Sequence, residues 1–130
     1  MSLDPKPGVV IFAKDVASLS GFYEKVFLLV VKHNEPEKVV LESDSFMLVI
    51  HGIPQEIASS INITCPPDIR KNTAIKMFLP VRSIADARLD AASLGGAIKS
   101  VKYEWSAANF KACDGYDPEG NVIQVRECAP

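Results

Sequence analysis

The chain has few of the side chains and segments that would assign it to a specialised class of protein. It has only two histidines, and its three cysteines, Cys65, Cys113 and Cys128, lack the paired spacing of a zinc site, so we expect reduced thiols. No apolar run approaches the ~20 residues that span a bilayer. The net charge of −2 comes with scattered basic residues, which is not the pattern of a nucleic-acid-binding surface. Residues 1–8 are polar and proline-rich, so we expect no secretory signal and a cytoplasmic location.

The motifs of the commonest catalytic sites are missing as well. There is no serine–histidine–aspartate order, no paired carboxylate motif and no glycine-rich phosphate loop, because Gly95 and Gly96 follow a predicted helix and do not precede one. What remains is an ordinary globular composition, with 48% hydrophobic and 23% charged residues. The length of 130 residues predicts one domain, residues 1–130, with a single core.

A strand–helix unit occurs twice in the sequence. Residues 9–13 form a predicted strand, followed by Asp15 as a helix N-cap. Residues 74–80 form another, followed by Ser83 as N-cap with Asp86 three residues later, a variant of the capping box. Placing Asp15 on Ser83 superimposes the apolar helix positions of the two units, Val16, Leu19, Tyr23 and Val26 on Ile84, Ala87, Ala91 and Leu94. The chain therefore contains an internal repeat.

Three strand-like segments follow each helix, so each half has the order βαβββ. They are residues 30–32, 38–42 and 46–51 in the first half and residues 97–101, 110–113 and 122–127 in the second. The connection of residues 53–72 carries three prolines and predicts a linker with one helical turn at 55–60. We therefore expect one module at about residues 8–52 and another at about residues 73–127.

The most specific local feature is the turn Asp117-Pro118-Glu119-Gly120-Asn121. Proline presets φ at its position, glycine accepts a positive φ, and the flanking Asp and Asn side chains bond to nearby backbone groups. Strand-like residues lie on both sides of this turn. It therefore predicts a closing β-hairpin.

The paired βαβββ order, this closing turn and Phe22-Tyr23-Glu24 in the first helix together resemble the glyoxalase, bleomycin-resistance and extradiol-dioxygenase superfamily, also called the vicinal oxygen chelate superfamily. The resemblance extends from about Gly8 to Glu127. It implies an α+β fold in which the curled mixed sheets of two modules surround a cleft while the helices pack behind them. It also implies a cleft that is shared within a chain or across a dimer, and we expect a homodimer.

The residues at the superfamily's metal-binding positions do not provide the usual ligands. By the resemblance, these positions fall at Gly8, Leu48, Lys76 and Gln124, where the metalloenzymes have histidines and carboxylates. Glycine and leucine offer no ligand atom, protonated lysine has no free lone pair, and an amide oxygen is a weaker ligand than a carboxylate. We therefore predict no metal and no other cofactor.

A rearranged metal site is the first alternative. Its candidate ligands are His33, His51, Cys113, Glu42 and Asp114, although the two histidines lack the spacing of a metal motif. Such a site would make the protein a glyoxalase-type lyase or isomerase, or a dioxygenase, with the ion acting as a Lewis acid.

Alternation along the strands predicts an apolar cleft that contains two polar groups. Lys76 and Gln124 would supply the polar groups, and Phe12, Leu48 and Phe78 the apolar walls. Further residues of the same parity are Val10, Phe46, Ile50 and Val122. In the alternative interpretation, these apolar residues fill the half-barrel as core.

Two side chains have several possible roles. Lys76 lies among apolar neighbours, where it would hold a ligand carboxylate or phosphate, or act as a base or nucleophile after losing its proton. Its third possible role is structural, with the ammonium extended to solvent or in an ion pair with Glu42, Glu104 or Asp114. Trp105 lies between two predicted strands, and it would stack on a flat ligand or pack in a dimer interface.

These features favour a metal-independent binding protein. We predict that it sequesters a small organic molecule in an apolar cleft, as bleomycin-resistance proteins do, and Lys76 favours an anionic group on that molecule. The remaining alternative, besides a metal-dependent enzyme, is a metal-free lyase with Lys76 as base. The sequence assigns no catalytic residue.

Overall fold

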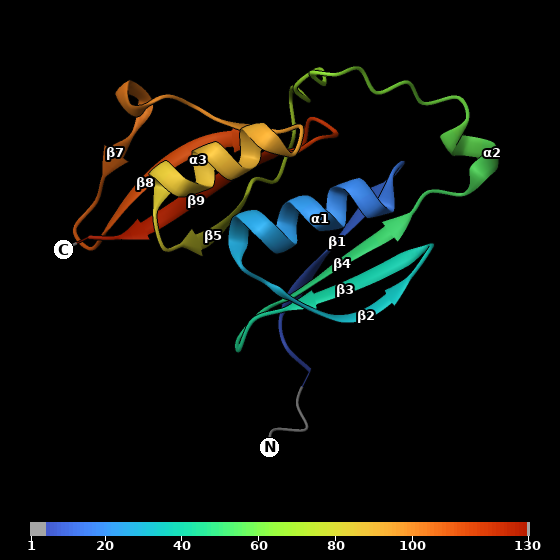
Figure 1. Cartoon of the computed structure of the whole chain (residues 1–130), viewed down its shortest axis with the longest axis horizontal. Coiled ribbons are helices and arrows are strands. Elements are labelled where there is room, and N and C mark those ends of the chain that lie inside the picture. Colours follow the sequence, from blue (N-terminus) through green and yellow to red (C-terminus); the bar gives the residue numbers. More distant parts are fainter. Residues whose placement is uncertain (1–4, 130) are drawn as a thin grey trace.

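Two mixed β-sheets, each with a helix packed on one face, form the structure (Figure 1), a computed structural model that describes residues 5–129. The helices are α1, Val16–Phe27, and α3, Ile84–Ser93. They contact each other and lie side by side near the centre of Figure 1. The α+β class expected from the sequence is confirmed.

The first sheet has four strands in the order β1-β4-β3-β2. Its strands are β1, Gly8–Ala13; β2, Val30–Glu35; β3, Lys38–Glu42; and β4, Met47–Gly52. β1 and β4 are parallel, and the other neighbours are antiparallel. Since parallel neighbours need a long crossover, the chain passes through α1, which packs on β3 and β4.

The second sheet repeats this arrangement in the order β5-β9-β8-β6, with β7 paired to β8. Its strands are β5, Met77–Val81; β6, Ala97–Ile98; β7, Trp105–Ser106; β8, Phe110–Tyr116; and β9, Val122–Cys128. β5 and β9 form its parallel pair. The strand predicted at residues 97–101 is cut short, because the chain leaves β8 after Lys99 and forms a 3₁₀ turn, Val101–Tyr103, before β7.

Both predicted helix starts are confirmed. The side chain of Asp15 accepts a 3.0 Å hydrogen bond from the backbone N–H of Ser18. That of Ser83 accepts a 3.1 Å hydrogen bond from the N–H of Asp86. Each bond satisfies a backbone donor that the helix itself leaves without a partner. The repeat in the sequence is therefore a repeat in the structure.

The connection between the halves contains the expected helical turn as α2, Gln55–Ala58. In Figure 1 this connection arches beside the two sheets before it enters β5. The ammonium of Lys14 bonds to the carbonyl of Ile61, and the N–H of Arg70 donates a 2.9 Å hydrogen bond to the carbonyl of Gly120. These contacts attach the connection to both halves. Within residues 5–129, no helix has the length and apolar character required to cross a bilayer.

The core lies between the two sheets and the two helices. Its largest fully buried side chains are Tyr23, Phe22, Leu19, Leu41, Leu48, Ile50, Ile84, Ile123 and Val125. Alternate residues of β1 point away from this core, where Val10 is 52% exposed and Phe12 is 61% exposed. Each sheet therefore has one face covered by its helix and one open face.

The closing hairpin has the predicted turn and also joins the two halves. Gly120 has a φ of +84°, which requires glycine, and its N–H donates a 2.9 Å hydrogen bond to the carbonyl of Asp117. The buried carboxylate of Glu119 accepts hydrogen bonds from the backbone N–H groups of Lys14, at 2.9 Å, and Asp15, at 2.8 Å. The turn of the second half thus holds the start of α1 in the first half.

Candidate functional site

The polar groups predicted for the cleft, Lys76 and Gln124, are brought together by Asp114 on the open face of the second sheet. The Lys76 ammonium donates a 2.9 Å hydrogen bond to Oδ2 of Asp114. The Gln124 amide donates a 3.0 Å hydrogen bond to Oδ1 of the same carboxylate. Asp114 and Gln124 are cross-strand partners in β8 and β9, and Lys76 directly precedes β5. Asp114 is therefore the partner among the three carboxylates considered for Lys76.

Arg126 extends this polar chain along β9. Its Nε donates a 2.7 Å hydrogen bond to the amide oxygen of Gln124. Its guanidinium lies between two aromatic rings, 3.5 Å from the centroid of Phe78 and 4.3 Å from that of Phe110. Trp105 packs edge-on against Phe110, with 5.6 Å between centroids. The result is an aromatic row in which one guanidinium is held in a fixed plane.

The carboxyl group of Asp114 is held in its ionised form. Partial burial would raise its pKa, but the hydrogen bonds from Gln124 and Lys76 and the positive charges of Lys76 and Lys99 outweigh burial, so the pKa of Asp114 lies below its ordinary value. Both oxygens of this carboxylate are hydrogen-bonded. Asp114 is therefore a fixed negative charge between two lysines.

A cavity of about 400 Å³ opens beside this chain. It is lined by Ile69, Thr73, Lys76, Ala97, Lys99, Asp114, Gly115, Tyr116 and Val122. The volume is within the range of small-molecule sites, and the lining combines apolar walls with a few charged groups. Of the residues predicted for the cleft, Lys76 and Val122 line this cavity, while Phe78 and Trp105 lie on the same open face along the aromatic row.

Leu48 was predicted for the cleft, and this prediction is wrong. It lies on the core face of β4, fully buried, with Val9 and Leu41 as its strand neighbours. Ile50 is buried on the same face, and Phe46 packs against the core. In the parallel pair Gly8 is opposite Met47, so even-numbered residues of β1 share a face with odd-numbered residues of β4. The predicted register of β4 was therefore off by one residue, and a shift of one residue exchanges the two faces of a strand.

Phe12 does lie on an open face, but on that of the first sheet. Its strand neighbour is His51, and the two rings meet edge-on at 5.9 Å. The cavity lies on the second sheet, where Lys76 lines it and Gln124 lies next to it through Asp114, so the structure does not bring Phe12 to these residues.

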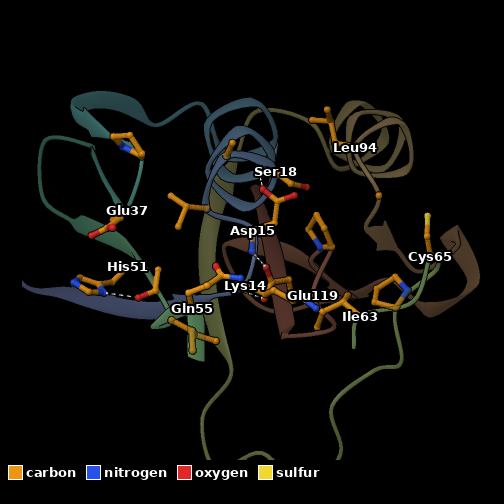
Figure 2. A pocket seen from close by; sticks show the side chains of 18 of the residues that line it. Lys14, Asp15, Ser18, Glu37, His51, Gln55, Ile63, Cys65, Leu94 and Glu119 are labelled. Atoms are coloured by element: carbon orange, nitrogen blue, oxygen red, sulfur yellow. Dashed lines mark hydrogen bonds between the residues drawn. The ribbon is translucent and has the colours of Figure 1, made fainter. Parts of the chain in front are cut away.

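A larger groove of about 970 Å³ lies where the connection passes the start of α1 (Figure 2). Figure 2 shows Lys14, Asp15 and Glu119 close together inside it. All three are engaged in internal contacts: Glu119 with two backbone N–H groups, Asp15 with Ser18, and Lys14 with a carbonyl. We attribute this groove to the junction between the parts of the chain, and prefer the smaller cavity as the candidate site.

The superfamily's metal does not fit the residues at its usual positions. A Cβ at Gly8 would overlap the carbonyl oxygen of Met47, so this position has no room for a side chain. Leu48 is buried in the core, and the Lys76 ammonium is bound to Asp114. The Gln124 oxygen already accepts a hydrogen bond from Arg126. No mechanistic step through a metal follows from this arrangement.

The residues of the alternative metal site are also dispersed. His33 bonds to Glu35 at 2.8 Å and His51 to the carbonyl of Gly52 at 2.9 Å, both on the first sheet. Cys113 is buried in the second sheet, where its thiol donates to the carbonyl of Lys99. Burial is the largest effect on Cys113 and raises its pKa. Residues 5–129 contain no group of three or more His, Cys, Asp or Glu placed to hold a metal ion.

Several solved structures share the fold. A glyoxalase/bleomycin resistance protein/dioxygenase family enzyme from Burkholderia phytofirmans PsJN is 16% identical, with a TM-score of 0.66 over 94% of this chain and 97% of that chain. A glyoxalase-related enzyme from Fulvimarina pelagi is 14% identical, with a TM-score of 0.66 over 96% and 88%. The fosfomycin resistance protein FosX from Listeria monocytogenes is 10% identical, with a TM-score of 0.64 over 97% and 94%. No protein-family model and no curated protein sequence matches the chain.

Similarity at these identities establishes the fold and nothing finer. It covers nearly the whole length of both chains in each case, and it agrees with the two repeated strand–helix–strand units described above. The resemblance in the sequence is therefore confirmed for the architecture: the chain has the fold of the glyoxalase, bleomycin-resistance and extradiol-dioxygenase superfamily.

Proposed function

We propose that this protein binds a small organic molecule on the open face of its second sheet, without a resident metal. The observation that carries the proposal is the cavity of about 400 Å³ next to the hydrogen-bonded chain of Lys76, Asp114, Gln124 and Arg126. Rigid polar groups beside an apolar cavity fix the orientation of a ligand at little entropic cost.

The aromatic row supports binding of an organic molecule in preference to an inorganic ion. Phe78 is 52% exposed and Trp105 is 45% exposed, so both rings present surface to solvent on this face. Exposed aromatic rings next to a cavity favour flat or apolar ligands. The anionic group expected on the ligand would lie near the lysines of the cavity.

The proposal also includes a cytoplasmic homodimer. The open face of the first sheet carries the exposed apolar side chains Val10, Phe12 and Val30. Exposed apolar side chains on the open face of a sheet favour association with another protein surface. A second copy that covers this face would shield its apolar side chains from water.

Catalysis is not part of the proposal. Lys76 is engaged in an ion pair with Asp114, at 2.9 Å, and does not stand free as a base towards a ligand. A Lewis-acid reaction would need ligands that the usual positions lack. Sequestration, in contrast, needs only the cavity and its polar groups.

The proposal is tested by screening a panel of small anionic, neutral and cationic metabolites by thermal shift and by fluorescence of Trp105, the single tryptophan. We expect at least one compound to raise the melting temperature saturably and to change the fluorescence. Ile69→Asp, in the cavity wall, should abolish this binding, while Ile57→Asp, exposed on α2, should leave it unchanged.

Elemental analysis of protein purified without chelator separates the proposal from its main rival. We expect no stoichiometric zinc, nickel, manganese or iron. Stoichiometric metal whose removal abolishes ligand binding would support the metal-dependent enzyme instead. A panel without any saturable compound would refute the binding function itself.

A further inference from the structure

We infer that Lys99 is the anchor of the ligand and that it selects an organic anion with one negative charge, such as a carboxylate, over neutral and cationic molecules. This inference rests on the proposed function and assigns the charge selectivity of the same site. The sequence suggested Lys76 for this role, and the structure favours the second lysine that lines the cavity.

The charge of Lys76 is already compensated. Its ammonium lies 2.9 Å from Oδ2 of Asp114, and the other oxygen of that carboxylate is held by Gln124. Asp114 keeps its negative charge, because its pKa lies below the ordinary value. Lys76 and Asp114 therefore form a pair with no net charge at neutral pH.

Lys99 lines the same cavity and has no comparable partner among residues 5–129. Its ammonium lies over the ring of Tyr103, 5.4 Å from the centroid, and a ring attracts a cation without cancelling its charge. The positive charge of Lys99 helps to lower the pKa of Asp114, but the two carboxylate oxygens of Asp114 are hydrogen-bonded to Lys76 and Gln124 and not to Lys99. The charged groups of the cavity thus leave one positive charge uncompensated.

A ligand that fills the cavity lies beside Lys99 and displaces part of the water around its side chain. Removing water from an unpaired charge is costly unless the incoming group supplies the opposite charge. A neutral ligand does not offset this desolvation cost, and a cationic ligand adds electrostatic repulsion to it. An anion offsets it by forming a charge-assisted hydrogen bond with the ammonium. The apolar body of the ligand would lie along Ile69, Tyr116 and Val122, which line the same space.

The test uses three probes of similar size and different charge: benzoate, benzamide and benzylamine. Each is titrated into ¹⁵N-labelled protein while the amide signals of Gly115, Tyr116 and Val122 in the cavity are followed by NMR. We expect benzoate to shift these signals saturably, and benzamide to bind about tenfold more weakly, the scale of one charge-assisted hydrogen bond. Benzylamine should bind more weakly still.

Two lysine variants form a matched pair, because both ammonium groups lie over Tyr103 but only Lys99 lines the cavity. Lys99→Met should weaken benzoate about tenfold and remove the preference for benzoate over benzamide. Lys102→Met should leave both affinities within about twofold, as expected for an exposed charge that does not line the cavity.

Equal binding of benzoate and benzamide to the wild-type protein overturns the charge selection and leaves the binding function intact. The same holds if Lys99→Met and Lys102→Met bind benzoate alike. Absence of saturable shifts with all three probes overturns the inference, whereas the proposed function then fails only if the wider metabolite panel is also negative.

Discussion

The hydroxyl of Tyr23 donates a 2.8 Å hydrogen bond to Oδ2 of Asp117 and so joins the first helix to the closing turn of the second half. Both side chains are fully buried. Asp117 also accepts hydrogen bonds from the backbone N–H groups of Glu119 and Asn121 and from the Asn121 amide. The two sequence features that carry the family resemblance, the Phe-Tyr helix and the closing turn, are therefore in contact.

Tyr23→Phe should lower the free energy of unfolding by about 1 to 3 kcal/mol, because it removes a donor from a buried carboxylate. Burial raises the pKa of Asp117 above its unfolded value, so the stability from this group is present below the unfolded pKa and is lost as pH rises through the folded pKa. The Tyr23 hydroxyl opposes the increase in the pKa of Asp117, because its hydrogen bond stabilises the ionised carboxylate. The deficit of the variant should therefore be largest at neutral pH and shrink in acid.

Urea denaturation at a series of pH values measures this effect, with Tyr103→Phe as control because Tyr103 is exposed. A deficit that is independent of pH would show that the hydroxyl does not act through the ionisation of Asp117.

Glu119 makes the second link between the halves, and Glu119→Ala should be among the most destabilising single changes. It leaves two backbone N–H groups, those of Lys14 and Asp15, without their acceptor. We expect a loss of about 2 to 4 kcal/mol in the free energy of unfolding, and a smaller loss for Glu119→Gln, which keeps one acceptor oxygen. Glu24→Ala, exposed on α1, is the control and should be nearly neutral by chemical denaturation.

Much of the fold could be predicted because local signals agreed with the global arrangement. The caps Asp15 and Ser83, the apolar helix spacing and the closing turn each depend on nearby residues, and the structure has all of them except the helix position at Leu94, which follows α3 and is 36% exposed. The face of β4 could not be predicted in the same way. It depends on which residue lies opposite Gly8, and that pairing is set by tertiary packing.

The site was predicted in part for a similar reason. Lys76 and Gln124 were found from their positions in the resemblance, but their link through Asp114 depends on the β8–β9 register. Arg126 and Lys99 were missed, since an isolated basic residue in a strand or after one gives no local signal. Counting alternate residues back from Gln124 along the hairpin would have placed Asp114 beside it.

Lys76→Met should raise the pKa of Asp114. In the wild-type protein that pKa lies below its unfolded value, so Asp114 stabilises the fold above the unfolded pKa, and this contribution is lost as pH falls through the folded pKa. Without Lys76, the contribution of Asp114 to the free energy of unfolding becomes smaller. The two proteins should therefore differ most at neutral pH, by less than about 1 kcal/mol for so exposed a pair, and converge in acid.

A ¹³C NMR titration of the Asp114 carboxyl group gives its pKa directly. Lys102→Met serves as the control for loss of one positive charge. An unchanged pKa in Lys76→Met would mean that the ion pair is not populated in solution.

Phe12→Asp should convert the proposed homodimer into a monomer. The side chain is 61% exposed on the open face of the first sheet, and a carboxylate there would be desolvated in a dimer. Leu89→Asp is the matched control, because Leu89 is 72% exposed on α3, away from that face. Analytical ultracentrifugation of the three proteins would contradict the dimer if the wild type sediments as a monomer, or if both variants dissociate it equally.

Gly8 stands at the position where the resemblance would place the first metal ligand, and the backbone of β4 leaves no space there for a side chain. Gly8→Ala should lower the free energy of unfolding by about 1 to 3 kcal/mol, because the added Cβ overlaps the carbonyl oxygen of Met47 and forces β1 away from β4. Gly21→Ala is the control. A Cβ at Gly21 meets no atom within 4 Å, and alanine in the interior of α1 should stabilise the protein by about 0.5 to 1 kcal/mol. Chemical denaturation of the two variants should give shifts of opposite sign. A neutral Gly8→Ala would mean that the edge of the first sheet yields easily and that this position has room for a ligand side chain.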